Sequence, residues 1–263
     1  MMIIFGIIIL SSLHTDWMLL SAAASAKPDK CTQYGREIAY PSIVSQGATI
    51  CFVYTETPQE YDGQLSRPAD GVAVYAATDL GTLPIPFELP YAGTAGMIVD
   101  SFVVADEMLG KEKLFVVHSF MTPRSWEVVG DIYSVSVFGI EAGVLVRDEN
   151  ASRFFGFGGD LIREEVGLRF SYPFKTRRDV ELIIQSSLYR ARVDQREIYA
   201  SVSEKAFLYE GALEPFVQVK AKKYLLKGDR VLVLDATEGW CKVSYGPPAK
   251  NIVMWLQCKS LSV

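Results

Sequence analysis

Histidine is scarce in this chain. The 263-residue sequence holds two, and one of them, His14, lies within an N-terminal apolar run. A Ser-His-Asp or Cys-His triad in the rest of the chain would therefore have to use His118. His118 lies between Val117 and Ser119 in a strand-like run, where a histidine is usually packed rather than catalytic, and the sequence has no G-x-S-x-G motif. We therefore predict that the protein is not an enzyme and assign no catalytic residues.

The glycine-rich and acidic motifs are incomplete. FFGFGGD (154–160) has three glycines but lacks the Lys-Ser/Thr ending of a phosphate-binding loop, which favours a bulge or turn. DENAS (148–152) resembles the start of a calcium-binding loop, but the glycine at the sixth position and the glutamate at the twelfth are missing. Glu164 and Glu165 are adjacent, so on a strand they would point to opposite faces rather than form a glycosidase pair. We assign no metal site and no cofactor.

Positive charge is outnumbered by negative charge. The chain has 26 Lys and Arg residues against 31 Asp and Glu, a net charge of −5, whereas nucleic acid usually selects a basic face. We therefore predict no nucleic-acid partner. One segment departs from this balance, because VKAKKYLLKGDR (219–230) places five basic side chains close together. Such a run is either a solvated strand face or a surface for an acidic partner or an anionic wall polymer.

No Lys or Arg precedes the apolar run MIIFGIIILSSL at 2–13, although secretory signal peptides usually begin with positive charge. The small residues of LLSAAASAKP (19–28) nevertheless supply the A-x-A pattern of a cleavage site. We predict a signal peptide over residues 1–26, cleaved after Ala26, and a soluble periplasmic protein. An uncleaved anchor is the alternative, but a histidine and an aspartate inside the apolar span would be costly in a bilayer.

Cysteine is sparse but even in number. The four cysteines all lie after the predicted cleavage site, and an even count in an exported chain predicts disulfide bonds. Of the three pairings, sequence separation favours Cys31–Cys51 and Cys241–Cys258, each local to one end of the chain. A zinc site is the alternative, but the sequence has no C-x-x-C pair, and one histidine remains after the signal peptide.

Long helical periodicity is also absent. Most of the chain consists of alternating or β-branched runs bounded by Gly, Pro, Asp or Asn, at a spacing typical of β-sandwiches, barrels and propeller-like sheets. The expected strands cover residues 48–57, 71–78, 96–106, 113–120, 131–140, 143–149 and 179–193. We therefore predict an all-β fold.

A polar stretch, DQREIYASVSEK (194–205), separates these runs from a last set of strands. It predicts a domain boundary. We expect a β-rich domain, sandwich or propeller-like, over residues 27–200 and a smaller β domain over residues 201–263.

The last 60 or so residues resemble the bacterial SH3-like domain. YLLKGDRVLVLDATEGWCKVSY (224–245) and VMWLQCKSL (253–261) carry its KGD start, its GW-KV-Y middle and its final tryptophan. Met254 departs from the family, which often has glycine there. The resemblance implies a small SH3-like barrel with Trp240 and Trp255 in its core, found in exported bacterial proteins, where it binds peptidoglycan or packs beside a partner domain.

Aromatic and basic side chains are the predicted contacts with a partner. Three belong to the glycine-rich stretch, and the others belong to the C-terminal segment. They are Phe154, Phe155, Phe157, Tyr209, Lys222, Lys223, Tyr224 and Tyr245.

Export, a β-rich body and a C-terminal SH3-like module make the chain similar to periplasmic immunity and inhibitor proteins. We predict that it binds a secreted antibacterial effector, for example a type VI secretion hydrolase or lipase, and occludes the effector's active site. The alternative is a cell-wall protein that binds peptidoglycan through the SH3-like domain. Such a module normally accompanies a hydrolase, and the sequence shows no hydrolase motif.

Overall fold

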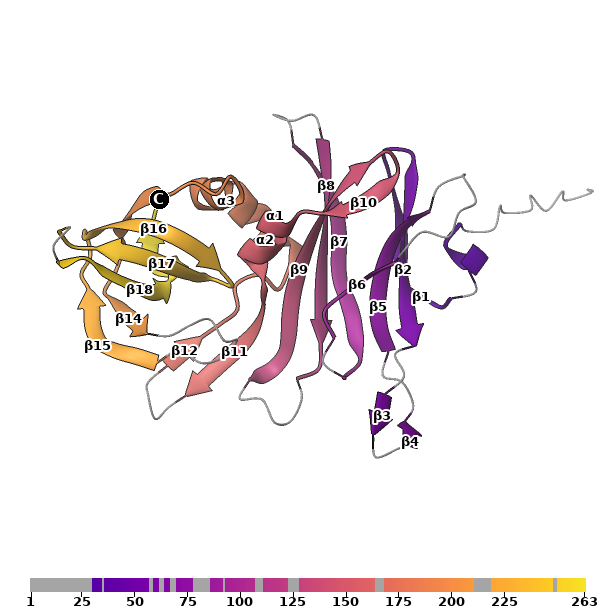
Figure 1. Ribbon diagram of the computed structural model, residues 1–263, viewed down its shortest axis with the longest axis horizontal. Coiled ribbons are helices and arrows are strands. Elements are labelled where there is room, and N and C mark those ends of the chain that lie inside the picture. Colours follow the sequence, from indigo (N-terminus) through magenta and orange to yellow (C-terminus); the bar gives the residue numbers. More distant parts are fainter. Residues whose placement is uncertain are drawn as a thin grey trace, which may run out of the picture.

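Figure 1 shows a computed structural model of the protein. It describes residues 30–34, 36–56, 59–61, 64–66, 70–77, 86–91, 93–106, 111–122, 128–163, 168–210, 219–247 and 250–263. The predicted signal peptide, Glu164, Glu165 and the side chain of Lys222 lie outside these described parts. The fold is all-β, as the sequence predicts, and it is built from several antiparallel sheets. Within the described residues, no helix is long and apolar enough to cross a membrane.

The first sheet lies at the N-terminal end of the molecule. Its strand order is β1-β2-β5-β6, with bounds Ile38–Ser45, Ala48–Glu56, Asp70–Ala77 and Phe87–Glu88. A short separate hairpin pairs β3 (Gln59–Tyr61) with β4 (Gln64–Ser66). The 3-10 helix η1 (Lys30–Tyr34) precedes the first strand.

The middle sheet has the order β12-β11-β9-β8-β7, and β10 also pairs with β9. Its strands are β7 (Gly96–Asp106), β8 (Lys111–Phe120), β9 (Val129–Glu141), β10 (Val144–Arg147), β11 (Phe157–Arg163) and β12 (Leu168–Phe170). The run LFVV in β8 is buried at every position, which indicates a strand covered on both faces.

The two faces of the middle sheet pack against different neighbours. Leu114 and Val116 face the first sheet, where they meet Ile50 and Phe52, so the two sheets form a sandwich. The alternate residues of β8 belong to a second core, which is shared with the helices and the C-terminal sheet.

Two short α-helices replace one predicted strand. Residues 179–193 form α2 (Arg177–Ile184) and α3 (Ser187–Val193) rather than a strand. Thr176 and Asp179 form a reciprocal capping box at the start of α2, and the Ser186 side chain caps α3. These caps satisfy helix amide groups, and they outweigh the strand preference of the β-branched residues between them.

The DENAS stretch is the start of a helix. Asp148 is the N-cap of α1 (Glu149–Phe155), and its side chain accepts a hydrogen bond from the amide of Ala151. The stretch that resembles the start of a calcium-binding loop is therefore the N-cap and first turn of α1. Gly156 ends the helix with a φ of 56°, a backbone angle that favours glycine.

The C-terminal sheet has seven strands in the order β15-β14-β18-β17-β16-β13-β19 and curls on itself (Figure 1). They are β13 (Ile198–Val202), β14 (Ala206–Glu210), β15 (Val219–Leu225), β16 (Arg230–Thr237), β17 (Trp240–Tyr245), β18 (Ile252–Gln257) and β19 (Leu261–Ser262), with the 3-10 helix η4 (Cys258–Ser260) before the last. Trp240 and Trp255 are buried.

The C-terminal sheet is joined to the rest of the chain by a continuous core. This core includes Phe115 of the middle sheet, Phe155 of α1 and Trp240 of β17. The sheet also begins at Ile198. The expected boundary between residues 200 and 201 therefore falls inside β13, and the two predicted segments share one hydrophobic core.

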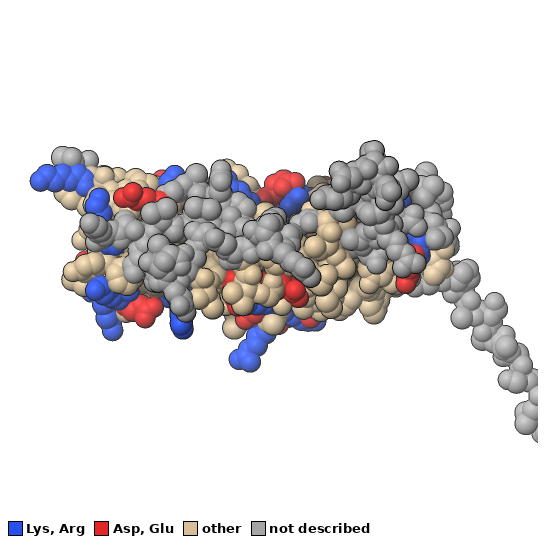
Figure 2. Space-filling model, turned by 90° about the horizontal axis from the view of Figure 1, so that it is seen from below, with Lys and Arg blue, Asp and Glu red and all other residues tan. Residues whose placement is uncertain are grey.

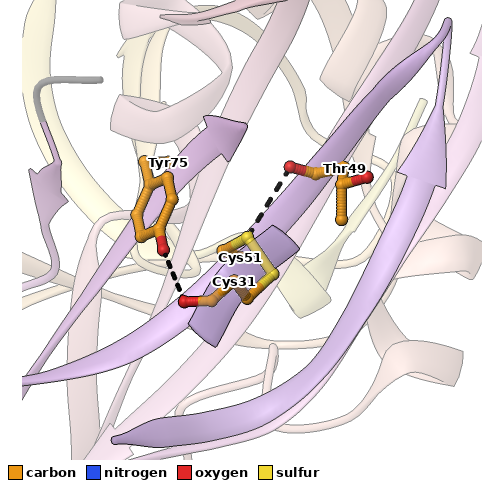
Figure 3. The surroundings of a disulfide bond; sticks show 4 residues. All are labelled: Cys31, Thr49, Cys51 and Tyr75. Carbon is orange, nitrogen blue, oxygen red and sulfur yellow. Dashed lines mark hydrogen bonds between the residues drawn. A yellow bond between two sulfur atoms is a disulfide. The ribbon is translucent and has the colours of Figure 1, made fainter. Parts of the chain in front are cut away.

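The predicted disulfide pairing is confirmed. Cys31 is bonded to Cys51 and Cys241 to Cys258. Figure 3 shows the first bond, which ties η1 to β2. Beside it, the Tyr75 hydroxyl donates a hydrogen bond of 3.1 Å to the Cys31 carbonyl oxygen. The second bond joins β17 to η4 at the end of β18, so one disulfide fixes each end of the molecule.

Candidate partner-binding groove

The phenylalanines of the glycine-rich stretch do not form an exposed loop. Phe154 and Phe155 lie on α1 with 3% and 0% of their surface exposed, and both rings pack against Phe174. The helix turns both side chains into the core, so the prediction that they contact a partner is wrong. Phe157 is half-buried at the start of β11. The predicted bulge is confirmed, because the pairing of β11 with β9 shifts between Gly158 and Asp160.

The predicted contacts in the C-terminal segment separate into two groups. Tyr245 is half-buried and packs against the main core from β17. Lys223 and Tyr224 lie exposed on β15, next to β14, which carries Tyr209. The structure therefore brings Tyr209 and Tyr224 into one region and leaves Tyr245 outside it.

A groove of about 320 Å³ lies in that region, where β14 meets β12 and the end of β18. Its walls combine basic, aromatic and aliphatic side chains. The lining includes Ile162, Arg169, Lys205, Phe207, Tyr209 and Lys259. A hydrogen bond of 3.0 Å from the Gln257 side chain to the Arg169 carbonyl oxygen joins β18 to β12 beneath the groove.

An irregularity in β14 sets the direction of the aromatic side chains. The pairing with β15 shifts between Phe207 and Tyr209, so Leu208 and Tyr209 are both buried while Phe207 points outward with 39% of its surface exposed. The Tyr209 ring packs edge-on against Trp240 at 5.0 Å. Burial raises the pKa of the Tyr209 phenol above its usual value. Like any tyrosine at neutral pH, it carries its proton and is a hydrogen-bond donor.

An exposed aromatic pair flanks the groove. Phe207 and Tyr224 are cross-strand neighbours on β14 and β15, with ring centroids 6.4 Å apart in an edge-on arrangement. The Lys205 ammonium lies 4.2 Å from the Tyr224 ring centroid and 5.3 Å from that of Phe207. These cation–π contacts hold an exposed lysine beside two rings, a combination that suits a contact surface more than a solvated strand.

The cations of the groove are not neutralised within the described residues. Arg169, Lys205 and Lys259 form no ion pair with a described carboxylate, although eight other Lys and Arg residues do. Glu204 is the acidic residue of the groove wall. The groove therefore carries a positive charge that an acidic partner would balance.

The surrounding sheet extends this charge. Residues 198–263 contain nine Lys and Arg against six Asp and Glu, a net charge of +3, while residues 1–197 contain 17 against 25, a net charge of −8. In Figure 2, a view from below, Lys and Arg side chains gather mostly toward the left, where Figure 1 places the C-terminal sheet. The chain is acidic overall but presents a basic end.

His118 lies away from the groove, inside the sandwich. Its side chain is 2% exposed, and burial lowers its pKa to about 4. Neither ring nitrogen has a hydrogen-bond partner, and the same holds for the hydroxyl of its cross-strand neighbour Ser134, within the described part of the chain. The four cysteines are bonded in pairs. Across the described residues, no group of three His, Cys, Asp or Glu side chains is placed to hold a metal ion.

Among the groove residues named above, sequence reasoning found Tyr209 and missed five: Ile162, Arg169, Lys205, Phe207 and Lys259. They come from β11 and β12 of the middle sheet and from the β14 region and η4 of the C-terminal part, and the packing of these two sheets brings them together. One signal was available, because the run KAFLY alternates basic, apolar and aromatic residues directly before Glu210. No protein-family model, curated protein or solved structure matches the chain.

Proposed function

We propose that the protein is an exported, periplasmic immunity or inhibitor protein, which binds a secreted antibacterial effector and blocks its active site. Effectors of this class include hydrolases and lipases delivered by type VI secretion. The observation that carries the proposal is the groove whose cations form no ion pair with a described carboxylate, beside the exposed Phe207–Tyr224 pair. Aromatic residues and arginine are enriched at protein interfaces and dominate their binding energy.

Two observations support export. The A-x-A pattern after an apolar N-terminal run is typical of a cleaved signal peptide. The disulfides Cys31–Cys51 and Cys241–Cys258 are typical of an oxidising compartment such as the periplasm.

The mechanism of inhibition is occlusion. A protein that covers a catalytic cleft makes and breaks no bond, so it requires a rigid surface rather than catalytic groups. The disulfide between β17 and η4 fixes the wall of the groove that carries Lys259. A stable interface covers about 800 Å² on each partner, so the groove would form its centre, with exposed side chains such as Tyr224 and Leu226 around it.

The experiment that tests the proposal is affinity purification of the tagged protein from the periplasm of its native host, followed by mass spectrometry. We expect one exported hydrolase or lipase to co-elute in stoichiometric amount. The purified enzyme should lose its activity when one equivalent of this protein is added. An enzyme that remains fully active in the saturated complex would contradict inhibition.

Peptidoglycan binding is the second candidate function. The resemblance of residues 224–245 to SH3-like domains favours it, and so does the curled C-terminal sheet, which buries Trp240 and Trp255. Sedimentation with purified sacculi separates the two candidates. A protein that pellets with sacculi and co-elutes with no enzyme would replace the inhibitor proposal with a wall-binding one.

A further inference from the structure

The geometry of the groove points to one kind of occupant: an acidic, extended segment of the partner protein. In this arrangement a carboxylate of the segment contacts Arg169, Lys205 and Lys259, while an apolar side chain two positions away contacts Ile162 and Phe207. The inference rests on the proposed function in one respect, since that function makes the partner a protein.

The positive charge of the groove favours an acidic group on the partner. Three basic side chains from separate elements line the groove with one glutamate, and none of the three forms an ion pair with a described residue. The guanidinium of Arg169 offers parallel N–H donors that match a carboxylate, whereas the two lysines act as point charges. A partner carboxylate would therefore gain charge-assisted hydrogen bonds without displacing an ion pair between these cations and any residue that the structure describes.

The apolar side chains of the groove favour a peptide ligand over a wall polymer. Ile162 and Phe207 are 48% and 39% exposed, and both line the same groove as the cations. Side chains two positions apart on an extended peptide point to the same side, so an acidic residue and an apolar residue enter the groove together. A hydrophilic sugar or phosphate chain would leave Ile162 and Phe207 uncovered.

Tyr209 supplies a neutral hydrogen bond at the base of the groove. Its ring is fixed against Trp240, and its hydroxyl has no hydrogen-bond partner among the described residues. The hydroxyl is therefore able to donate to the carboxylate or to a backbone carbonyl of the segment. Replacing Tyr209 with phenylalanine keeps the ring packing and removes the donor, so we expect Tyr209→Phe to weaken binding about fivefold while the melting temperature stays within about 2 °C.

The direct test uses a random dodecapeptide display library selected on the purified protein. We expect enrichment of peptides that place Asp or Glu two positions from Val, Ile, Leu or Phe. The double variant Lys205→Glu/Lys259→Glu should bind the selected peptides at least tenfold more weakly. The matched variant Lys227→Glu/Lys250→Glu changes the net charge equally at exposed positions of the same region outside the groove, and it should bind within about twofold of the wild type.

The outcomes separate this inference from the proposed function. If an effector co-purifies and is inhibited but both double variants bind it equally, the function stands and the groove inference is wrong. If acidic–apolar peptides are selected and released by the groove variant but no effector is found, the groove chemistry stands and the inhibitor proposal is wrong. If the library yields no acidic–apolar peptides and sacculi bind the wild type but not the groove variant, the occupant is an anionic wall polymer and the inference is overturned.

Discussion

Glu238 is the titratable residue whose position has the clearest consequence for stability. It lies in the turn between β16 and β17 with a φ of 57°, and its side chain packs against Gly156 so closely that a Cβ there would clash. Burial raises the pKa of its carboxyl group from 4.5 to about 7, and a hydrogen bond from the Phe157 amide opposes the shift. Burial is the main cause that raises the pKa of Tyr172, and the negative charge of the Glu238 carboxylate raises it further.

The first prediction concerns the pH dependence of unfolding. Between pH 4.5 and about 7 the folded protein retains a proton on Glu238 that the unfolded chain has released. The free energy of unfolding therefore falls as pH rises through this range and levels off above it. Glu238→Gln keeps an oxygen that accepts from the Phe157 amide but cannot ionise. At pH 8 we expect this variant to be more stable than the wild type by about 3 kcal/mol.

Denaturant unfolding at pH 4.5, 6 and 8 measures this effect. His118, whose pKa is lowered to about 4, acts in the opposite direction, because stability falls as pH drops below its unfolded value of 6.5. The difference between the wild type and Glu238→Gln cancels the histidine contribution. The exposed Glu210→Gln serves as the control. A difference that does not change between pH 4.5 and 8 would disprove the buried-carboxyl argument.

At the scale of elements, two hydrogen bonds to backbone carbonyl groups join the end of α1 to the C-terminal sheet, beside the Arg153–Asp235 ion pair. The Thr237 hydroxyl donates to the Arg153 carbonyl oxygen at 2.7 Å, and the Glu238 amide donates to that of Phe154 at 3.0 Å. Carbonyl groups in the last turn of a helix have no partner within the helix, so the β16–β17 turn satisfies two that α1 leaves open. This turn docks the C-terminal sheet onto α1.

The second prediction tests that joint. Thr237→Val preserves the shape of a buried side chain, which is 7% exposed, and removes the hydroxyl donor. It leaves the Arg153 carbonyl without this bond, so we expect a loss of about 1–2 kcal/mol of unfolding free energy, measured by denaturant titration. Thr237→Ser retains the hydroxyl and should recover most of the loss. If valine is as stable as the wild type while serine loses stability, methyl packing rather than the hydrogen bond holds the joint.

Sequence patterns predicted strands better than they predicted helices or the groove. Alternating and β-branched runs identified β2, β5, β7, β8 and β9, and each of these strands pairs over most of its length. It failed over 179–193, where β-branched residues imitate a strand and the caps at Thr176 and Ser186 decide the outcome. Arg169 and Lys259 are 90 positions apart, so a pattern along the chain does not reveal that they share a groove.

At the scale of the whole molecule, charge is distributed unevenly. Residues 198–263 carry a net charge of +3 within a chain of net charge −5. Salt at about 0.1 M screens charges beyond roughly 10 Å, so a ligand or surface near the C-terminal sheet responds to the local cations rather than to the distant acidic residues. Although the whole protein is acidic, its C-terminal end should therefore attract negatively charged surfaces.

The third prediction follows from this asymmetry. We expect the protein, whose pI is about 5.2, to be retained on a cation-exchange resin at pH 7.5 and an ionic strength of about 0.05 M. Lys205→Glu/Lys259→Glu should pass through the column. Arg36→Glu/Lys111→Glu lowers the net charge equally at exposed positions before the C-terminal sheet and should still be retained. If the wild type passes through, or if both variants lose retention equally, binding to the resin depends on the net charge of the protein and not on its basic C-terminal end.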